Sequence, residues 1–447
     1  MTTTEKPWAD LTREEKRERR LEPYRNPAGV TFRDAKAERL YHERVARHLA
    51  AQMCETPDRV PVSLPTGFYP AYYAGYDFKT VMYDYEAARR AWKLFMDDFY
   101  EDMDSYGAGF VFSGRVFDIL DYHQYSWPGH GLGDNATTYQ FNEAQYMPPE
   151  EYGRYIDDPA DFGFRALTPR VIGAAEAWQF FPHLTNLNGM PMVPVMPFVR
   201  ADVREAFKKF IAAGEELERQ QQIMGGLFRE ILEAGFPAGR GGMGSAPFDL
   251  IADNLRGTQG VAVDMYRRPD VLLEAIEVTT DIHIKRLIES VNAVNGFQCS
   301  FPLHKGDDVF MSRKQFEKFY WPGLKKVIDA LIAEGIMVHL FAEGSYNQRL
   351  DYLGDFPKGW VSLLFDKTDM AAAKKAVGDK CCISGNVPAS LMVTGTPQEV
   401  KDNCRRLIET CAPGGGYILA GGCSATETKN PDNFRVFMEA AVEYGTY

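Results

Sequence analysis

Residues 335–345 read GIMVHLFAEGS, an apolar run that would form a buried strand if His339 and Glu343 did not interrupt it. Short apolar, β-branched or aromatic runs of this kind recur along the chain, separated by long amphipathic stretches. The alternation is typical of β/α units and not of a sandwich of two sheets. Eight runs qualify as strands: residues 60–64, 109–113, 235–239, 296–301, 336–341, 360–365, 381–386 and 417–421. Eight such units predict an α/β fold, a (β/α)8 TIM barrel.

The chain is predicted to have two parts. Residues 1–56 are charged and carry apolar positions at helical spacing, which predicts an N-terminal helical extension. Residues 57–447 form the predicted barrel, with an insertion at about 115–234 after the second strand. We expect an insertion of this length to be a lid, a wall of the substrate pocket or a contact in a homodimer.

Composition excludes several classes of protein. The 447 residues are 45% hydrophobic, so the chain can bury a large core. Fifty basic against 62 acidic residues give a net charge of −12, which argues against nucleic acid as a partner. The first 25 residues lack a signal-peptide core and no long uncharged apolar run follows, so we expect a cytoplasmic protein without a membrane partner. The seven cysteines lack C-x-x-C spacing, which indicates neither a disulfide framework nor a zinc ribbon.

Polar side chains near the ends of the predicted strands are the candidates for chemistry, because these ends converge at one mouth of a barrel. The set is rich in residues that can bind a metal. It comprises Ser63, Thr66, Arg115, Asp118, Arg240, His304, Asp307, His339, Glu343, Asp366, Asn386 and Cys423.

Cys423, His339 and Glu343 are the first candidates for metal ligands. A cation at the mouth would favour the thiolate of Cys423, although a buried structural cysteine is the alternative. His339 and Glu343 share one face of a strand, but a straight strand would hold them about 13 Å apart, too far for one zinc ion. Both can bind one metal only if the chain turns near Gly344; otherwise one of them binds it and the other supports that ligand or contacts the substrate. For His339 the alternative is a hydrogen-bonded core histidine.

The segment 121–147 holds an aromatic cluster that could form a flat apolar pocket with polar tips. Alternatively, these rings pack into a small satellite core. The cluster comprises Tyr122, His123, Tyr125, Trp127, His130 and Tyr139.

Five stretches resemble the uroporphyrinogen decarboxylase superfamily. They are GSAPFDL (244–250), FMSRKQFEKFYWPGLKKVI (310–328), FAEG (341–344), ISGNVPASLMVTGTPQEV (383–400) and GGGYILAGGC (414–423). The resemblance runs from about Arg59 to the C-terminus and also implies a (β/α)8 barrel. The superfamily comprises porphyrinogen decarboxylases and zinc-dependent methyltransferases that exchange methyl groups with corrinoid proteins.

Two motifs favour the methyltransferase branch. True decarboxylases carry an arginine-rich motif at the first strand, and the matching stretch VSLPTGFYPAYYAG (62–75) has no arginine. They also end the last strand in Gly-His-Gly, whereas this chain has Cys423, which resembles the zinc-binding cysteine of the methyltransferases.

The His-x-Cys zinc motif that the branch carries at the fifth strand can be aligned in two registers. If the histidines are aligned, His339 takes the place of the motif's histidine. If the glycines are aligned, Glu343 takes the place of its cysteine, and the zinc-binding glutamate of related methionine synthase barrels would then correspond to a position near Asp366.

The resemblance thus implies a methyltransferase, the demethylase component that moves a methyl group from a methoxylated aromatic or other methylated small molecule to a corrinoid (cobalamin) protein. The expected zinc ligands are Glu343, Cys423, His339 and Asp366. The expected catalytic groups are Glu343, with His304 or Tyr122 as proton donor. The expected substrate-binding residues are His123, Trp127, His130, Arg240 and Asn386. The alternatives are a decarboxylase of a non-porphyrin acid and a non-catalytic barrel that binds a tetrapyrrole or corrinoid.

Overall fold

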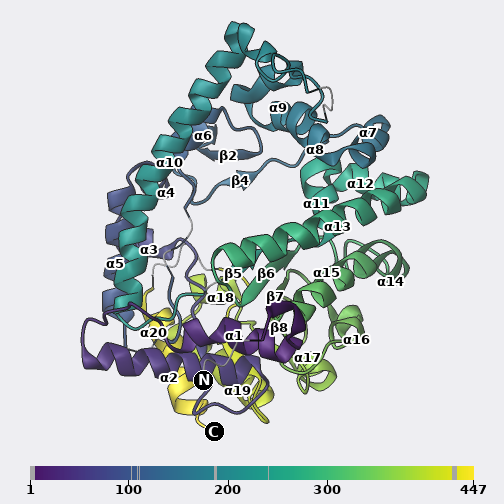
Figure 1. The fold of residues 1–447 in the computed structure, drawn as a ribbon. Helices are drawn as coiled ribbons and strands as arrows, with labels where there is room; N and C mark the ends of the chain where they lie inside the picture. Colours follow the sequence, from purple (N-terminus) through teal and green to yellow (C-terminus); the bar gives the residue numbers. More distant parts are fainter. Residues whose placement is uncertain are drawn as a thin grey trace.

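The structure of the protein is a computed structural model that describes residues 6–101, 103–107, 109, 111–185, 189–239, 241–424 and 430–447. Its centre is a seven-stranded parallel sheet surrounded by helices, which forms a half-barrel (Figure 1). The strands across the sheet are, in order, β1 (Val62–Ser63), β10 (Tyr417–Ala420), β9 (Cys382–Ser384), β8 (Val361–Phe365), β7 (Met337–Ala342), β6 (Gln298–Leu303) and β5 (Gly241–Met243). This order and the helices between the strands confirm the α/β barrel class.

Two of the eight predicted strands differ from the structure. The third was predicted at 235–239, but Gly235 has φ +85° and follows the end of a helix, and the strand β5 begins only at Gly241. Its glycines have no β propensity and join the sheet through backbone pairing with β6. In the described part of 109–113 no strand forms, so β1 and β5 are the two ends of the sheet.

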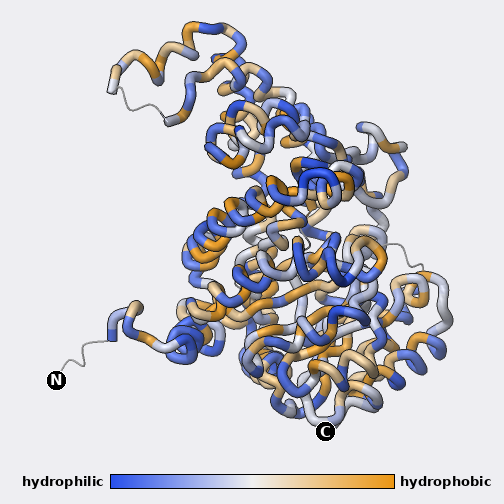
Figure 2. The backbone as a smooth tube through the Cα atoms, turned by 90° about the vertical axis from the view of Figure 1, so that its right-hand side faces the viewer, coloured by the Kyte–Doolittle hydropathy of each residue, from blue (hydrophilic) through white to orange (hydrophobic). Residues whose placement is uncertain are grey.

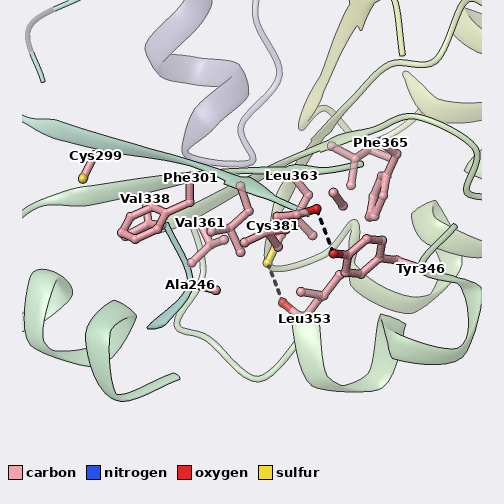
Figure 3. Packing of buried hydrophobic residues seen from close by; sticks show 14 of the residues in the cluster. Ala246, Cys299, Phe301, Val338, Tyr346, Leu353, Val361, Leu363, Phe365 and Cys381 are labelled. Atoms are coloured by element: carbon pink, nitrogen blue, oxygen red, sulfur yellow. Dashed lines mark hydrogen bonds between the residues drawn. The ribbon is translucent and has the colours of Figure 1, made fainter. Parts of the chain in front are cut away.

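Side chains of the sheet alternate between two environments. Phe301, Val338 and Leu363 point toward the outer helices and are at most 1% exposed, and Figure 3 shows them packed together. Burying a side chain of this size stabilises the fold by roughly 1.5–3 kcal/mol. The opposite side chains line the barrel interior, where register places His339 of β7 between Ser300 and Ser362 of its neighbours.

The helices that follow the strands cover the outside of the sheet. After β5 come α11 (Pro247–Ile251), a π-helical turn η6 (Ala252–Arg256), α12 (Gly257–Arg267) and α13 (Pro269–Ala293). After β6 and β7 come α14 (Arg313–Gln315), α15 (Trp321–Ala333) and α16 (Leu350–Leu353). After the last three strands come α17 (Met370–Val377), α18 (Ala389–Thr394), α19 (Pro397–Cys411) and α20 (Asp432–Tyr444).

Two N-terminal helices, α1 (Arg13–Arg25) and α2 (Ala35–Gln52), form the extension. Arg20 of α1 donates to the carbonyl oxygens of Gly296 (2.9 Å) and Glu334 (3.0 Å), close to the starts of β6 and β7. Arg47 of α2 binds the buried carboxylate of Asp104, at 2.5 Å. The extension therefore packs against the end of the barrel opposite the mouth.

The insertion rises above the sheet, as Figures 1 and 2 show from two directions. Helices α3 (Tyr69–Tyr73), α4 (Phe78–Tyr83) and α5 (Tyr85–Phe99) precede it. It contains α6 (Gly114–Leu120), β2 (Tyr125–Pro128), β3 (Gly131–Leu132), β4 (Gln140–Phe141), α7 (Tyr152–Asp157), α8 (Pro159–Phe162), α9 (Thr168–Val171) and the long α10 (Ala201–Glu233). Strands β2, β3 and β4 form a separate small sheet. None of the helices in the described ranges is both long and apolar enough to cross a membrane.

Candidate functional site

A cavity of about 560 Å³ lies between the insertion and the ends of β5, β6 and β7. This volume is in the range of small-molecule sites. The insertion contributes Tyr125, Gln140, Phe141 and Glu143, and the barrel contributes Ser245, Asp253, Asn254, His304, Lys305 and Glu343. The cavity thus joins the predicted mouth of the barrel to part of the aromatic segment.

His304 is held in this cavity by a carboxylate. Its Nδ1 lies 2.6 Å from Oδ2 of Asp253 on the π-helical turn η6, so Nδ1–H donates to Asp253 and the other ring nitrogen, Nε2, remains available. The Asp253 carboxylate raises the pKa of His304, because it stabilises the imidazolium more than burial opposes it. Oε2 of Glu343 lies 4.0 Å from Nε2. A histidine in this setting can hold and release a proton near neutral pH.

The backbone of His304 is fixed by a second carboxylate, Asp249, four residues before Asp253 on the same helical segment. Asp249 is fully buried and accepts hydrogen bonds from the N–H groups of His304 (3.0 Å) and Lys305 (3.1 Å) and from the hydroxyl of Tyr320 (2.8 Å). Burial and the nearby Asp253 carboxylate raise the pKa of Asp249 to about 7. The helical segment after β5 therefore positions both the backbone and the ring of His304, which follows β6.

Lys305 connects the barrel to the insertion. Its Nζ lies 3.4 Å from Oε1 of Glu143 and 3.4 Å from Oδ1 of Asp253. Glu143 also accepts a hydrogen bond from the backbone N–H of Thr258 (2.7 Å). These contacts fix one wall of the cavity over the end of β6.

Glu343, Asp366 and Cys423 follow the ends of β7, β8 and β10, as predicted. Asp366 accepts a hydrogen bond from the backbone N–H of Gly344 (3.2 Å). Burial, followed by the Asp366 carboxylate, raises the pKa of the Cys423 thiol to about 12. The thiol is therefore protonated at neutral pH and hydrogen-bonded to Asp366.

His339 lies apart from this group, inside the barrel. Its Nδ1 is 2.9 Å from Oγ of Ser362. Burial lowers the pKa of His339 to about 4, so the ring is neutral. In the structure His339 takes the role of a hydrogen-bonded interior histidine.

The four predicted zinc ligands have suitable chemistry but not a suitable arrangement. Thiolate and carboxylate groups are suitable donors for zinc, but a site needs at least three of them around one point. Within the described ranges no three His, Cys, Asp or Glu side chains are grouped closely enough to hold a metal ion. As placed, Glu343, Cys423, His339 and Asp366 do not fit a zinc site, and the expected ligand set stays a prediction.

The aromatic cluster of the insertion packs mainly on itself. Tyr122 stacks on Tyr125, which lines the cavity, at 6.0 Å between ring centroids. Its hydroxyl donates to Gln124 (3.0 Å), and burial raises the pKa of Tyr122 to about 12. Of the predicted cluster, Tyr125 lines the cavity together with Phe141, which was not predicted, and Tyr122 lies behind Tyr125.

His123, Trp127 and His130 do not line the cavity. Trp127 stacks on His130 with 4.7 Å between centroids, and its indole N–H donates to the hydroxyl of Tyr83 (3.0 Å). Nε2 of His130 lies 3.2 Å from Asp118, and His123 is exposed, with Nε2 3.3 Å from a neighbouring aspartate. These contacts correspond to the satellite-core alternative.

Asn386 and Arg240 complete the predicted substrate-binding set. The side chain of Asn386 donates to the carbonyl oxygens of Asp366 (3.0 Å) and Thr368 (2.8 Å), so it fixes the loop after β8. Arg240 lies outside the described residues.

Asp253, Lys305 and Glu143 are the charged cavity residues that sequence reasoning missed. Asp253 lies on a helix and not at a strand end, and Glu143 lies in the insertion, so the strand-end rule could not select them. The spacing of Asp249 and Asp253 was the available signal, because two carboxylates one helical turn apart share a face.

Comparison with known proteins identifies the family. The model of the family described as "Uroporphyrinogen decarboxylase (URO-D)" matches residues 200–444, more than half of the chain. The uroporphyrinogen decarboxylase of Pseudoalteromonas translucida is 27% identical over 139 residues, 30% of this chain and 38% of the relative. That of Salinibacter ruber is 27% identical over 218 residues, 46% of this chain and 58% of the relative. The chain therefore spans well under two thirds of the length of these relatives.

Among solved structures, a methyltransferase from Methanosarcina mazei has a similar fold. The TM-score is 0.57 at 15% sequence identity, and the match covers 91% of this chain and 98% of the other. The likeness extends over the barrel and most of the remaining chain, so it concerns the whole fold. The family match over residues 200–444 shows that this chain belongs to the uroporphyrinogen decarboxylase family.

Proposed function

We propose that this protein is an enzyme that transfers a methyl group from a methoxylated aromatic or other methylated small molecule to a corrinoid protein. The observation that carries the proposal is the pair of Asp253 and His304 in the cavity, with Nδ1 bound to the carboxylate at 2.6 Å and Nε2 available. Breaking a methyl–oxygen bond leaves negative charge on the oxygen, and a positioned acid stabilises that charge.

Residues of this chain would bind the donor and deliver the proton. Tyr125 and Phe141 would hold a flat ring, and the His304 imidazolium would protonate the departing oxygen. The partner's corrinoid would supply reduced cobalt, which forms the new bond to the methyl carbon while the electrons of the carbon–oxygen bond remain on oxygen. His304 is favoured over Tyr122 as the acid, because burial raises the pKa of Tyr122 to about 12.

The similar fold of the Methanosarcina mazei methyltransferase supports a methyltransferase. The missing arginines of residues 62–75 support it as well, because no cationic side chain there would bind the carboxylates of a porphyrinogen. Zinc stays an expectation from the resemblance, and no step is assigned to it.

The test is to mix the purified protein with reduced cobalamin and a panel of methoxyarenes, methylamines and methyl thiols. Appearance of the methylcobalamin spectrum with a methoxyarene is the expected result, and His304→Gln should slow it by about 10²-fold or more. Absence of methylcobalamin with every donor would reject the proposal.

The second candidate is a decarboxylase of a non-porphyrin acid, which Lys305 favours. Its ammonium group in the cavity could bind a substrate carboxylate, and His304 could protonate the carbon from which carbon dioxide leaves. Release of carbon dioxide from aromatic acids, without methylcobalamin formation, would identify this activity.

A further inference from the structure

The cavity is lined by more acidic than basic side chains. Glu143, Asp253 and Glu343 are acidic, and Lys305 is basic. The Lys305 ammonium lies 3.4 Å from two of these carboxylates, those of Glu143 and Asp253, so its single charge is already shared. Even with His304 protonated, the lining carries a net negative charge.

Glu343 is the cavity carboxylate that has no cation within hydrogen-bond distance in the described part of the chain. Its side chain is 49% exposed, and the ion pair that it forms within the described part of the chain is with Nε2 of His304 at 4.0 Å, longer than a hydrogen bond. Glu343 lines the cavity, so its charge faces the space that a ligand would occupy. It can therefore bind a cationic group of a ligand.

An aromatic wall faces these carboxylates across the same cavity. Tyr125 and Phe141 lie on paired strands, with ring centroids 5.3 Å apart at an interplanar angle of 73°. Aromatic faces bind both flat rings and cations. An anionic ligand would meet uncompensated carboxylates and would have to compete with Glu143 and Asp253 for the Lys305 ammonium.

We propose that the methyl donor carries a positively charged amino group and that Glu343 binds this group while Tyr125 and Phe141 hold its ring. The inference rests on the proposed function, whose site it specifies further. It excludes aromatic acids and polycarboxylates as preferred ligands.

The test uses three ligands that share one methoxyphenol ring and differ in charge: 4-hydroxy-3-methoxybenzylamine, the corresponding benzyl alcohol and the corresponding benzoate. Binding to the full chain is measured by calorimetry at pH 7, without corrinoid. We expect the amine to bind at least tenfold more tightly than the alcohol, and the benzoate to bind most weakly.

Variants assign the preference to Glu343. Glu343→Gln should weaken binding of the amine about tenfold and leave binding of the alcohol unchanged, whereas Glu343→Asp should retain the preference. Glu150→Gln is the matched control, because it removes the same charge from an exposed position outside the cavity lining. Circular dichroism of each variant verifies folding.

Three results would overturn the inference: benzoate binding as tightly as the amine, an unchanged amine preference in Glu343→Gln, or no binding of any of the three ligands. Stoichiometric zinc that is lost in Glu343→Gln would also overturn it, by assigning Glu343 to a metal. Amine-selective binding without methyl transfer would retain the inference and reject the proposed function, so the two failures are distinguishable.

Discussion

Replacing Asp249 by asparagine perturbs the buried carboxylate that holds the backbone of His304. Aspartate accepts three hydrogen bonds there, at 2.8, 3.0 and 3.1 Å. Asparagine keeps one acceptor oxygen but turns an N–H₂ group toward one of these donors. At pH 8, where Asp249 is ionised, losing one bond to the charged carboxylate and burying an unsatisfied donor should together cost about 2–4 kcal/mol of unfolding free energy.

The pH dependence of this loss follows from the raised pKa of Asp249, about 7 in the folded protein. An unfolded aspartate has a pKa of about 3.9, so between about pH 4 and pH 7 the folded state binds the extra proton. The contribution of this carboxyl group to the unfolding free energy of the wild type is therefore fully present below about pH 4 and is lost as pH rises through 7. From pH 5 to pH 8 the loss is at most about 2.7 kcal/mol.

Asparagine does not titrate, so the difference between wild type and Asp249→Asn should shrink as pH rises from 5 to 8. Urea unfolding followed by tryptophan fluorescence at both pH values measures this difference. Asp379→Asn, at an exposed position, is the control and should change neither value. A difference that stays constant with pH, or grows, would refute the assignment of a raised pKa to Asp249.

Three further perturbations have defined outcomes. Asp253→Asn removes the partner that raises the pKa of His304, so the pH above which activity declines should be lower in the variant than in the wild type. An unchanged pH–rate profile would exclude His304 as the acid. Asp104→Ala removes a buried carboxylate that binds two arginines and should cost about 3–5 kcal/mol in urea unfolding; a loss below about 1 kcal/mol would contradict this. Gly415→Ala should lower the unfolding free energy by about 2 kcal/mol or more, because Gly415 has φ +78° and the new Cβ would lie 2.4 Å from the carbonyl oxygen of Glu55. Unchanged thermal unfolding of this variant would contradict the prediction.

The strands that could be predicted from the sequence are those with a run of apolar side chains. Residues 336–341 and 360–365 are mostly apolar, and β7 and β8 form there within one residue. β5 consists of two glycines and a methionine, so backbone pairing with β6 alone decides where it forms. The predicted third strand at 235–239 was wrong because Phe236, which is buried, packs after a helix end and not in the sheet.

The candidate site was predictable where a residue follows a strand. His304 and Glu343 follow β6 and β7 and line the cavity. Asp253 and Glu143 come from a helix and from the insertion, whose positions over the mouth depend on tertiary packing. Sequence periodicity carries no information about such packing between distant segments.

The segment 335–345 illustrates why residues on one face of a strand need not belong to one site. His339 and Glu343 share a face, but register pairs His339 with Ser300 and Ser362 inside the barrel, whereas Glu343 lies beyond the last paired residue of β7. Four residues along a strand correspond to about 13 Å, while neighbouring strands lie about 4.8 Å apart. Glu343 therefore lies near His304, which follows the neighbouring strand, and far from His339 on its own strand. The chemistry of the mouth is consequently assembled across the strands, and a ligand bound there would contact Asp253, His304 and Glu343, which belong to three β/α units.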